Sequence, residues 1–234
     1  MNLPRVYFMD LGLIDYQECW DTQTKLFDEI IHQKIYNRKN TERKKSTKNY
    51  LIFCEHPHVY TLGKSGDEKN LLISKKDQKS KNVTFYKTNR GGDITYHGPG
   101  QLVVYPILDL DYFFTDIHKY LRLLEETVIM TLAEYGLKGE RIEGLTGVWV
   151  NHQDNSRKIC AIGVKSSRWV TMHGIGFNIN SDLSYFNSIV PCGIDDKSVT
   201  SLQEELQENI NMTDLKNKFK NNFIHIFNIE LLEN

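Results

Sequence analysis

The sequence predicts an α+β fold in which helices pack on a mixed β-sheet. Two observations support this prediction: short apolar segments typical of buried strands, and longer segments with apolar residues at helical spacing. These segments follow one another without strict β-α-β alternation, so an α+β or mixed-sheet arrangement is expected. The chain contains no visible internal repeat or linker, and we therefore expect one domain spanning residues 1–234.

Composition and charge exclude several classes of protein. Hydrophobic residues make up 40% of the chain, enough for a sizeable core, and the net charge of -1 offers no general attraction to nucleic acid. No apolar run approaches the length of a membrane span, and the N-terminus lacks the features of a signal peptide. The four cysteines lack C-x-x-C spacing and are expected to be reduced thiols. We expect a cytoplasmic protein that binds neither nucleic acid nor membrane.

The N-terminal part predicts two strands, a helix and two polar loops. A strand at residues 6–11 precedes an amphipathic helix that begins near Tyr16. Residues 37–48 are basic and contain no interleaved aromatic side chains. This pattern favours a solvated loop over a contact with nucleic acid or an acidic protein. A buried strand at residues 50–54 is expected next, and residues 64–81 predict a second, lysine-rich loop.

The glycine-rich stretch at residues 90–101 lies between two predicted strands, 83–86 and 102–108. Gly98-Pro99-Gly100 suits a type II turn, because proline fixes φ at its second position and glycine supplies positive φ at its third. Arg90 and His97 would flank a glycine-walled floor, which predicts a substrate cradle; the alternative is a simple turn. The stretch lacks the G-x-G-x-x-G spacing of dinucleotide-binding folds.

The C-terminal half predicts a long helix, a set of strands and a final helix. Thr115 or Asp116 is a suitable N-cap for the long helix, and Gly136 is a suitable terminator. Residues 201–204 have the capping-box pattern, and a last helix is expected from about Thr213. The strands are predicted at residues 147–150, 158–164 and 169–178, with hairpin loops at 151–157 and 165–168.

His56, His58 and His173 are further candidates for functional groups. His56 and His58 are separated by a proline and have no third ligand nearby in the sequence, so no metal site is predicted. His173 is followed by Gly174-Ile175-Gly176, and glycine within a strand indicates the close approach of a ligand or another backbone. A histidine packed in the core is the alternative for His173.

Cys192 and Lys158 are the candidates for nucleophilic chemistry. Cys192 lies between a proline and a glycine, on a predicted turn. A thiolate forms near neutral pH only where a positive charge or a helix N-terminus lowers the reference thiol pKa of about 8.5. From its sequence position alone, Cys192 could equally be a reactive or an inert thiol. Strand alternation would place Lys158 on one face with Cys160 and Ile162. An inward lysine indicates an anionic partner or a catalytic task, and a surface lysine beside a hairpin is the alternative.

Several motifs together resemble the octanoyl-[acyl-carrier-protein]–protein octanoyltransferases, also called lipoyl(octanoyl) transferases. The most specific is R-G-G-D-I-T-Y-H-G-P-G-Q at residues 90–101. The resemblance covers roughly residues 5–205. The further motifs, in the family's order and spacing, are Glu55-His56-Pro57 with Tyr60-Thr61-Leu62-Gly63, Thr146-Gly147-Val148-Trp149, Lys158-Ile159-Cys160-Ala161-Ile162-Gly163, His173-Gly174-Ile175-Gly176 and Pro191-Cys192-Gly193.

This resemblance implies a cysteine/lysine acyltransferase with the fold of the lipoate/biotin protein ligase catalytic domain. Cys192 would take the octanoyl group as a thioester, and Lys158 would lower the pKa of that thiol and shuttle protons. His173 is a possible supporting residue without an assigned role. The implied substrate-binding residues are Arg90, Gly91, Gly92, Asp93, Ile94, Thr95, Tyr96, His97, Ala161, Ile162, Gly163, Gly174, Ile175 and Gly176.

The resemblance also implies the partners of the reaction. The donor would be octanoyl-acyl carrier protein, which carries the acyl group on its phosphopantetheine. The acceptors would be lipoyl domains of 2-oxoacid dehydrogenase E2 subunits and the glycine cleavage H protein. No cofactor is expected, because exchange of one thioester for another needs no ATP, and the histidine spacing predicts no metal site.

Two alternatives stay open at this point. ATP-dependent lipoate–protein ligases resemble the loop but typically continue with Asp and Gly-Asn instead of Gly98-Pro99-Gly100-Gln101, and they lack a nucleophile like Cys192. A non-catalytic carrier-binding module would keep the fold without the chemistry. The presence of both Lys158 and Cys192 argues against such a module.

Overall fold

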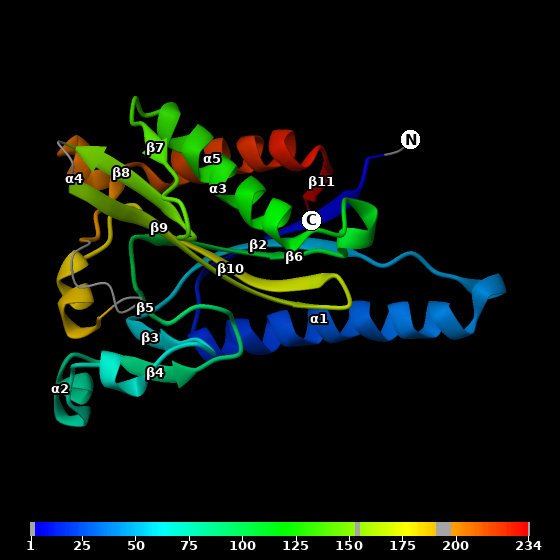
Figure 1. Cartoon of the computed structure of the whole chain (residues 1–234), viewed down its shortest axis with the longest axis horizontal. Coiled ribbons are helices and arrows are strands. Elements are labelled where there is room, and N and C mark those ends of the chain that lie inside the picture. The colour runs from blue at the N-terminus through cyan, green and yellow to red at the C-terminus, as the bar shows by residue number, and fades with distance from the viewer. Residues whose placement is uncertain (1–2, 153–154, 191–197, 234) are drawn as a thin grey trace.

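The computed structural model of the protein describes residues 3–152, 155–190 and 198–233. An eight-stranded mixed sheet has the order β11-β1-β2-β6-β10-β9-β8-β7, and a three-stranded sheet has the order β4-β3-β5 (Figure 1). The large sheet consists of β1 (Arg5–Leu13), β2 (Asn49–Glu55), β6 (Gln101–Ile107), β7 (Gly139–Glu140), β8 (Val148–His152), β9 (Asn155–Ser167), β10 (Val170–Asn178) and β11 (Glu230–Glu233). The small sheet consists of β3 (Val59–Leu62), β4 (Thr84–Lys87) and β5 (Ile94–His97).

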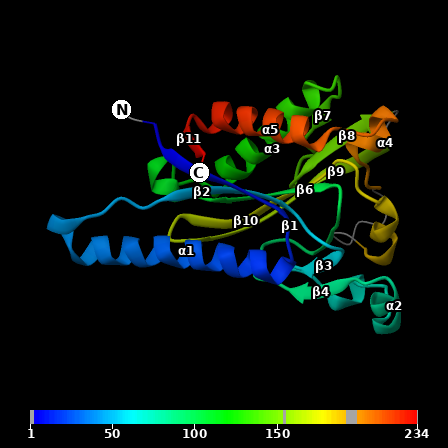
Figure 2. The same ribbon diagram turned by 180° about the vertical axis from the view of Figure 1, so that it is seen from behind.

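Helices cover both faces of the large sheet. α3 and α5 lie side by side on one face, and α1 runs along the other face, as both views show (Figures 1 and 2). The small sheet lies near the start of α1, where the Tyr16 ring is 5.2 Å from the ring of Tyr86 on β4. The α-helices are α1 (Tyr16–Lys39), α2 (Lys75–Ser80), α3 (Ile117–Ala133), α4 (Leu202–Leu206) and α5 (Met212–Phe227).

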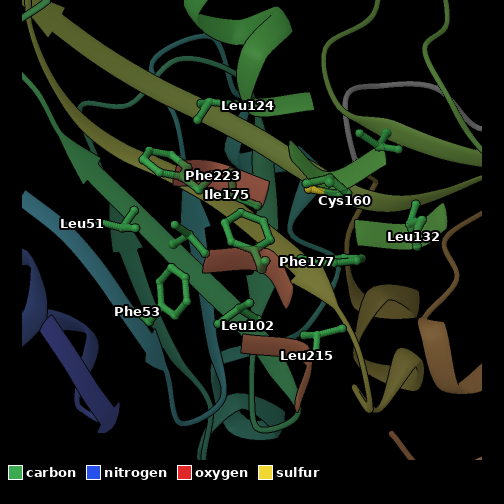
Figure 3. Packing of buried hydrophobic residues seen from close by; sticks show 14 of the residues in the cluster. Leu51, Phe53, Leu102, Leu124, Leu132, Cys160, Ile175, Phe177, Leu215 and Phe223 are labelled. Atoms are coloured by element: carbon green, nitrogen blue, oxygen red, sulfur yellow. The ribbon is translucent and has the colours of Figure 1, made fainter. Parts of the chain in front are cut away.

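The main core lies between the large sheet and the α3–α5 pair. Alternate residues of β6 and β10, such as Leu102 and Phe177, point to this side and meet Leu124 of α3 and Phe223 of α5 (Figure 3). A second cluster packs α1 against the opposite face of the same strands, with Phe27 among its fully buried members. The large sheet is therefore a middle layer, with apolar packing on both sides.

The predicted α+β architecture and most predicted elements are confirmed. α3 begins after Asp116, whose Oδ1 accepts a hydrogen bond from the Lys119 amide at 3.0 Å, and Gly136 has the positive φ of 74° expected after a helix end. The capping box before α4 is also present on its N-cap side, since the Ser201 hydroxyl accepts from the Glu204 amide at 3.2 Å.

Three local predictions are wrong. β9 is longer than predicted at both ends, so residues 155–157 and 165–167 are strand and not hairpin loop, and only Arg168 and Trp169 form the turn to β10, with φ of 51° and 64°. Such positive φ values at both central residues define a tight hairpin turn, which usually carries glycine or asparagine and was therefore not recognisable. The segments at 55–63 and 90–101 contribute β3 and β5, which the sequence analysis did not foresee. Residues 64–81 are also not entirely loop, because they contain α2, capped by the Ser74 hydroxyl on the Asp77 amide at 3.1 Å.

Candidate active site

A cavity of about 240 Å³ is lined by residues of both sheets and by segments that connect them. It brings together all the predicted binding residues except Gly91 and Tyr96, and it also includes Lys158 and His173. Tyr96 packs in the core of the small sheet instead, where its ring stacks 5.0 Å from that of Tyr185. The lining residues that the sequence analysis missed are Tyr16, Gln101, Tyr105, Gly144, Leu145, Thr146, Asn178, Phe186 and Val199.

The part of the cavity formed by β9 and β10 is lined by small residues, among them Ala161, Gly163, Gly174 and Gly176. β10 presents Val170 and Met172 to the second core, and further along Gly174 and Gly176 line the cavity. A Cβ on Gly174 would lie 2.2 Å from the Val104 carbonyl oxygen of β6, so glycine there allows the close approach of the two strands. Gly176 pairs with Ala161 of β9, so small residues meet across the two strands. A Cβ on Gly176 would lie 3.1 Å from Gln101 Oε1 and 3.3 Å from His97 Cε1. Glycine there keeps space beside these two side chains.

Arg90 joins the glycine-rich stretch to the small sheet. Its guanidinium is nearly buried and donates to the Thr61 carbonyl at 2.6 Å and to the Gly91 carbonyl at 3.0 Å. The Gly91 amide donates in turn to the Val164 carbonyl of β9 at 2.9 Å. A Cβ on Gly163 would come 2.8 Å from the Gly91 carbonyl oxygen. The close approach of two main chains therefore explains why glycine is needed at Gly163, whereas a Cβ on Gly91 would meet the Val164 carbonyl oxygen at 3.3 Å.

The turn predicted at Gly98-Pro99-Gly100 is confirmed. The Gln101 amide donates to the Gly98 carbonyl at 3.2 Å, and Gly100 has φ of 80°, as a type II turn requires at its third position. A Cβ on Gly100 would lie 2.4 Å from the Asn180 carbonyl oxygen, so the turn packs directly on the chain that follows β10. The turn thereby fixes the start of β6 and the position of Gln101.

A chain of buried hydrogen bonds orients His97. Gln101 Nε2 donates to the Tyr96 carbonyl at 3.1 Å and to Asn178 Oδ1 at 2.8 Å, so its Oε1 faces His97 Nδ1 at 2.6 Å. Asn178 Nδ2 donates to the Thr200 carbonyl at 2.9 Å. Because Oε1 can only accept, His97 Nδ1 carries the proton and Nε2 is the acceptor of the ring. Burial lowers the pKa of His97 to about 3, so the ring is neutral at pH 7.

His173 and His56 are neutral for the same reason. Burial, with the nearby Arg90 and Lys165 cations, lowers the pKa of His173 to about 3. His173 adopts φ of 59°, uncommon for a residue with a side chain, and its ring lies 6.2 Å from the ring of Trp20 on α1. Burial lowers the pKa of His56 to about 4. His97 and His173 thus present uncharged imidazoles to the cavity, whereas His56 is buried outside its lining.

Lys158 lies on the cavity side of β9, but not on the face predicted for it. The prediction that it shares a face with Cys160 and Ile162 is wrong, because β9 contains one extra residue relative to β8: Val148 pairs with Cys160, whereas Trp149 pairs with Lys158. Cys160 and Ile162 pack on the main core. This β-bulge reverses the alternation, and Lys158 Nζ lies 4.8 Å above the Trp149 ring.

The segment after residue 197 holds the main chain of Lys158. The Lys158 amide donates to the Ser198 carbonyl at 2.9 Å, and the Thr200 amide donates to the Lys158 carbonyl at 3.0 Å. Val190 is anchored elsewhere, with its amide on the Asn70 carbonyl at 2.9 Å. Cys192, the predicted nucleophile, lies outside the described residues.

One group of side chains has the composition of a metal site. Cys19, Cys54 and His56 are buried, and their ligand atoms lie within 4.8 Å of one another. Burial raises the pKa of the Cys54 thiol well above its usual value, which keeps the sulfur protonated. His56 Nδ1 donates to the Ile14 carbonyl at 2.8 Å, so its Nε2 accepts from the Tyr105 hydroxyl at 2.9 Å. We interpret the group as packing between α1 and β2. His58 lies apart from it, with Nδ1 2.7 Å from the Tyr96 hydroxyl.

No helix within the described part of the chain has the length and apolar character needed to cross a membrane.

Comparisons with known proteins agree with this geometry. The family model of the lipoyl protein ligase A/B catalytic domain matches residues 15–224. A curated octanoyltransferase from Christiangramia forsetii is 61% identical over 225 residues, covering 95% of each chain. Another, from Flavobacterium psychrophilum, is 57% identical and covers 97% of this chain and 98% of its own length.

Solved structures share the fold at low sequence identity. A bipartite lipoate protein ligase from Thermoplasma acidophilum superimposes with a TM-score of 0.70 at 16% identity, covering 100% of this chain and 87% of its own. A lipoate-protein ligase A structure bound with ATP gives 0.70 at 17% identity, covering 100% and 89%. The fold is therefore that of the lipoate ligases, and the much higher identity to the curated relatives places the chain in the octanoyltransferase family.

Proposed function

We propose that the protein transfers an octanoyl group from octanoyl-acyl carrier protein to a lysine of lipoyl domains, through a thioester on Cys192. The names of the curated relatives support octanoyl transfer, because these relatives are 61% and 57% identical to this chain over nearly its whole length. The observation that carries the proposal is the cavity itself. Glycines, apolar side chains and the neutral imidazoles of His97 and His173 form much of its lining, and Lys158, Arg90 and Asp93 are its charged members.

The cavity suits an acyl chain of this length. An apolar cavity of about 150 Å³ accommodates a six-carbon ring in a protein core, and the present one measures about 240 Å³. An eight-carbon chain buried at about 0.8 kcal/mol per methylene would contribute roughly 5 kcal/mol to binding. Binding energy of this size would select for acyl length without any polar contact to the chain.

Neither chemical step needs ATP, because the bonds and protons of each step are accounted for by the substrates, Cys192 and Lys158. In the first step the Cys192 thiolate attacks the acyl carbonyl, a new C–S bond forms, the C–S bond to the phosphopantetheine breaks, and the leaving thiolate takes a proton from Lys158. In the second step the acceptor lysine amine attacks the thioester, a C–N bond forms, the C–S bond to Cys192 breaks, and Lys158 carries the amine proton away. Such covalent catalysis divides one transfer between two carriers into two encounters.

The placement of Lys158 supports its role in this scheme. The β-bulge puts its side chain on the cavity side, and the two main-chain hydrogen bonds to Ser198 and Thr200 bring the segment that follows Cys192 alongside it. A cation near Cys192 would lower the pKa of the thiol and favour the nucleophilic thiolate. Main-chain amides of the glycine-rich segments are candidate donors to the oxyanion.

We infer that the acceptors are lipoyl domains of 2-oxoacid dehydrogenase E2 subunits and the glycine cleavage H protein. A solved relative in fold was described as a lipoate protein ligase with its E2 lipoyl domain. At 16% identity this supports the class of acceptor only by analogy. The basic residues of 37–48 and 64–81 are candidates for contact with the acidic carrier.

Intact mass spectrometry tests the proposal. The protein is incubated with octanoyl-acyl carrier protein in the absence of ATP. An octanoyl adduct on Cys192 that hydroxylamine removes, and that passes to an apo lipoyl domain, is the expected result. Acceptor modification that requires octanoate plus ATP, with no adduct on the protein, would instead identify an ATP-dependent ligase.

A further inference from the structure

One wall of the cavity is irregular chain. Gly144, Leu145 and Thr146 line the cavity between β7 and β8, alongside Lys158 and Val199. The segment contains a turn, in which the Leu145 amide donates to the Ile142 carbonyl at 3.1 Å and Gly144 has φ of 77°. No strand or helix includes these three residues, so other contacts must set their position.

A single buried carboxylate holds both ends of this wall. Glu125 of α3 is completely buried; its Oε2 accepts from Arg141 Nε at 3.0 Å and from Arg122 Nη1 at 2.8 Å. Its Oε1 accepts from the Gly147 amide at 3.0 Å. Arg141 precedes the wall and Gly147 follows it. The carboxylate therefore connects the two ends of the segment to the same point on α3.

The Gly147 end is also fixed from the opposite side. Gly147 has φ of 128°, and a Cβ on it would lie 2.6 Å from the Cys160 carbonyl oxygen of β9. Only glycine fits this contact, which accounts for its place in the Thr146-Gly147-Val148-Trp149 motif. Gly147, where the wall joins β8, therefore lies between the Glu125 carboxylate and β9, the strand that carries Lys158.

We propose that Glu125 is a positioning residue that sets the cavity wall at 144–146 and, through it, the acyl-chain length that the cavity accepts. The proposal rests on the proposed octanoyl transfer for its substrate. A buried carboxylate suits this purpose, because leaving either of its oxygens without a hydrogen-bond donor is costly. A shift of the wall would remove the donors that Arg141 and Gly147 supply. Glu125 acts through the wall and touches no substrate.

The variant Glu125→Gln tests this role. The glutamine oxygen can still accept a hydrogen bond from the Gly147 amide. The glutamine NH2 group cannot accept from the guanidiniums of Arg122 and Arg141, so the Arg141 end of the wall is released. We expect the ratio of kcat/KM for octanoyl over decanoyl carrier protein to fall about tenfold, since two methylenes bury a comparable binding energy. The rate at which Cys192 is alkylated at pH 7 should not change.

Glu126→Gln is the matched control. Glu126 also binds Arg141, with Oε2 2.5 Å from Nη2, but it is partly exposed and does not reach Gly147. Its replacement should leave the octanoyl-to-decanoyl ratio within about twofold of the wild-type value, as expected for an exposed ion pair. If Glu125→Gln does not fold, Arg141→Gln releases the same end while Arg122 still neutralises Glu125, and it should lower the ratio in the same direction.

The outcomes separate this inference from the proposed function. An unchanged length ratio in both Glu125→Gln and Arg141→Gln, with active enzyme, would overturn the positioning role and leave octanoyl transfer standing. If the wild-type protein transfers no acyl group, the proposed function falls. Calorimetric binding of octanoate and decanoate to the variants still tests the wall in that case, and an unchanged preference between the two acids would overturn it.

Discussion

The two faces of the large sheet are built from the same strands, but one face is packed in the core and the other borders the cavity. On the α3–α5 face, β9 and β10 present Cys160, Ile175 and Phe177 to a continuous apolar core. On the α1 face, the neighbouring positions of the same strands are Ala161, Gly174 and Gly176, and they border a cavity. Strand alternation allows one sequence to specify a packed face and an open one at once. Stability should therefore depend on the first face, and activity on the second.

The largest effect is expected for the proposed nucleophile. Cys192→Ser should reduce octanoyl transfer by roughly a thousandfold or more, because a serine hydroxyl is hardly ionised at neutral pH and loss of a nucleophile typically costs this much. Transfer rates and circular dichroism of the two proteins measure the effect. Near-normal transfer by the serine variant would contradict a covalent mechanism.

On the packed face, Phe177→Ala should lower the free energy of unfolding by about 3–5 kcal/mol, because it removes a completely buried ring from the main core. Denaturant unfolding measures this loss. At 10 °C, where the variant is still folded, its kcat/KM should stay close to that of the wild type. A large loss of kcat/KM in the folded variant would break the division between the two faces.

The buried neutral histidines predict a loss of stability in acid. Burial holds the pKa of His56 at about 4 in the folded protein, below its reference value near 6.5. The unfolded chain therefore binds the proton more tightly, and stability falls as pH drops from 6.5 toward 4. His56→Gln should reduce the slope of unfolding free energy against pH by about 1.4 kcal/mol per unit in that range. An identical slope in the variant would show that His56 is not buried neutral.

The smallest effect is expected one residue from Phe177. Gly176→Ala places a methyl 3.1–3.3 Å from Gln101 and His97, which must shift slightly. We expect KM for octanoyl carrier protein to rise about tenfold at most, with little change in unfolding free energy, since the methyl enters space that the acyl chain would use. A large destabilisation without a change in KM would assign Gly176 to packing.

Much of the site could be predicted because its residues are adjacent in sequence. The stretch at 90–101 contains its own turn, and the type II conformation follows from proline and glycine alone. The face occupied by Lys158 could not be predicted, because a β-bulge is set by the pairing of β8 with β9 and not by the residues of β9 alone. The wall at 144–146 was missed for a related reason. Its anchor, Glu125, lies on a helix and carries no signal of a binding site in the sequence.

By itself the sequence determined most of the strands and helices, because periodicity and capping are local properties, and its motifs identified the family. The short elements β3, β5 and α2 were not among them. The tertiary structure decided which residues meet around the cavity. Tyr16, Lys158 and Val199 are far apart in the chain and become neighbours only when α1, β9 and the segment after residue 197 pack together. It also decided the charge of the cavity walls, because the pKa of His97 or His173 depends on burial, which arises only from long-range packing.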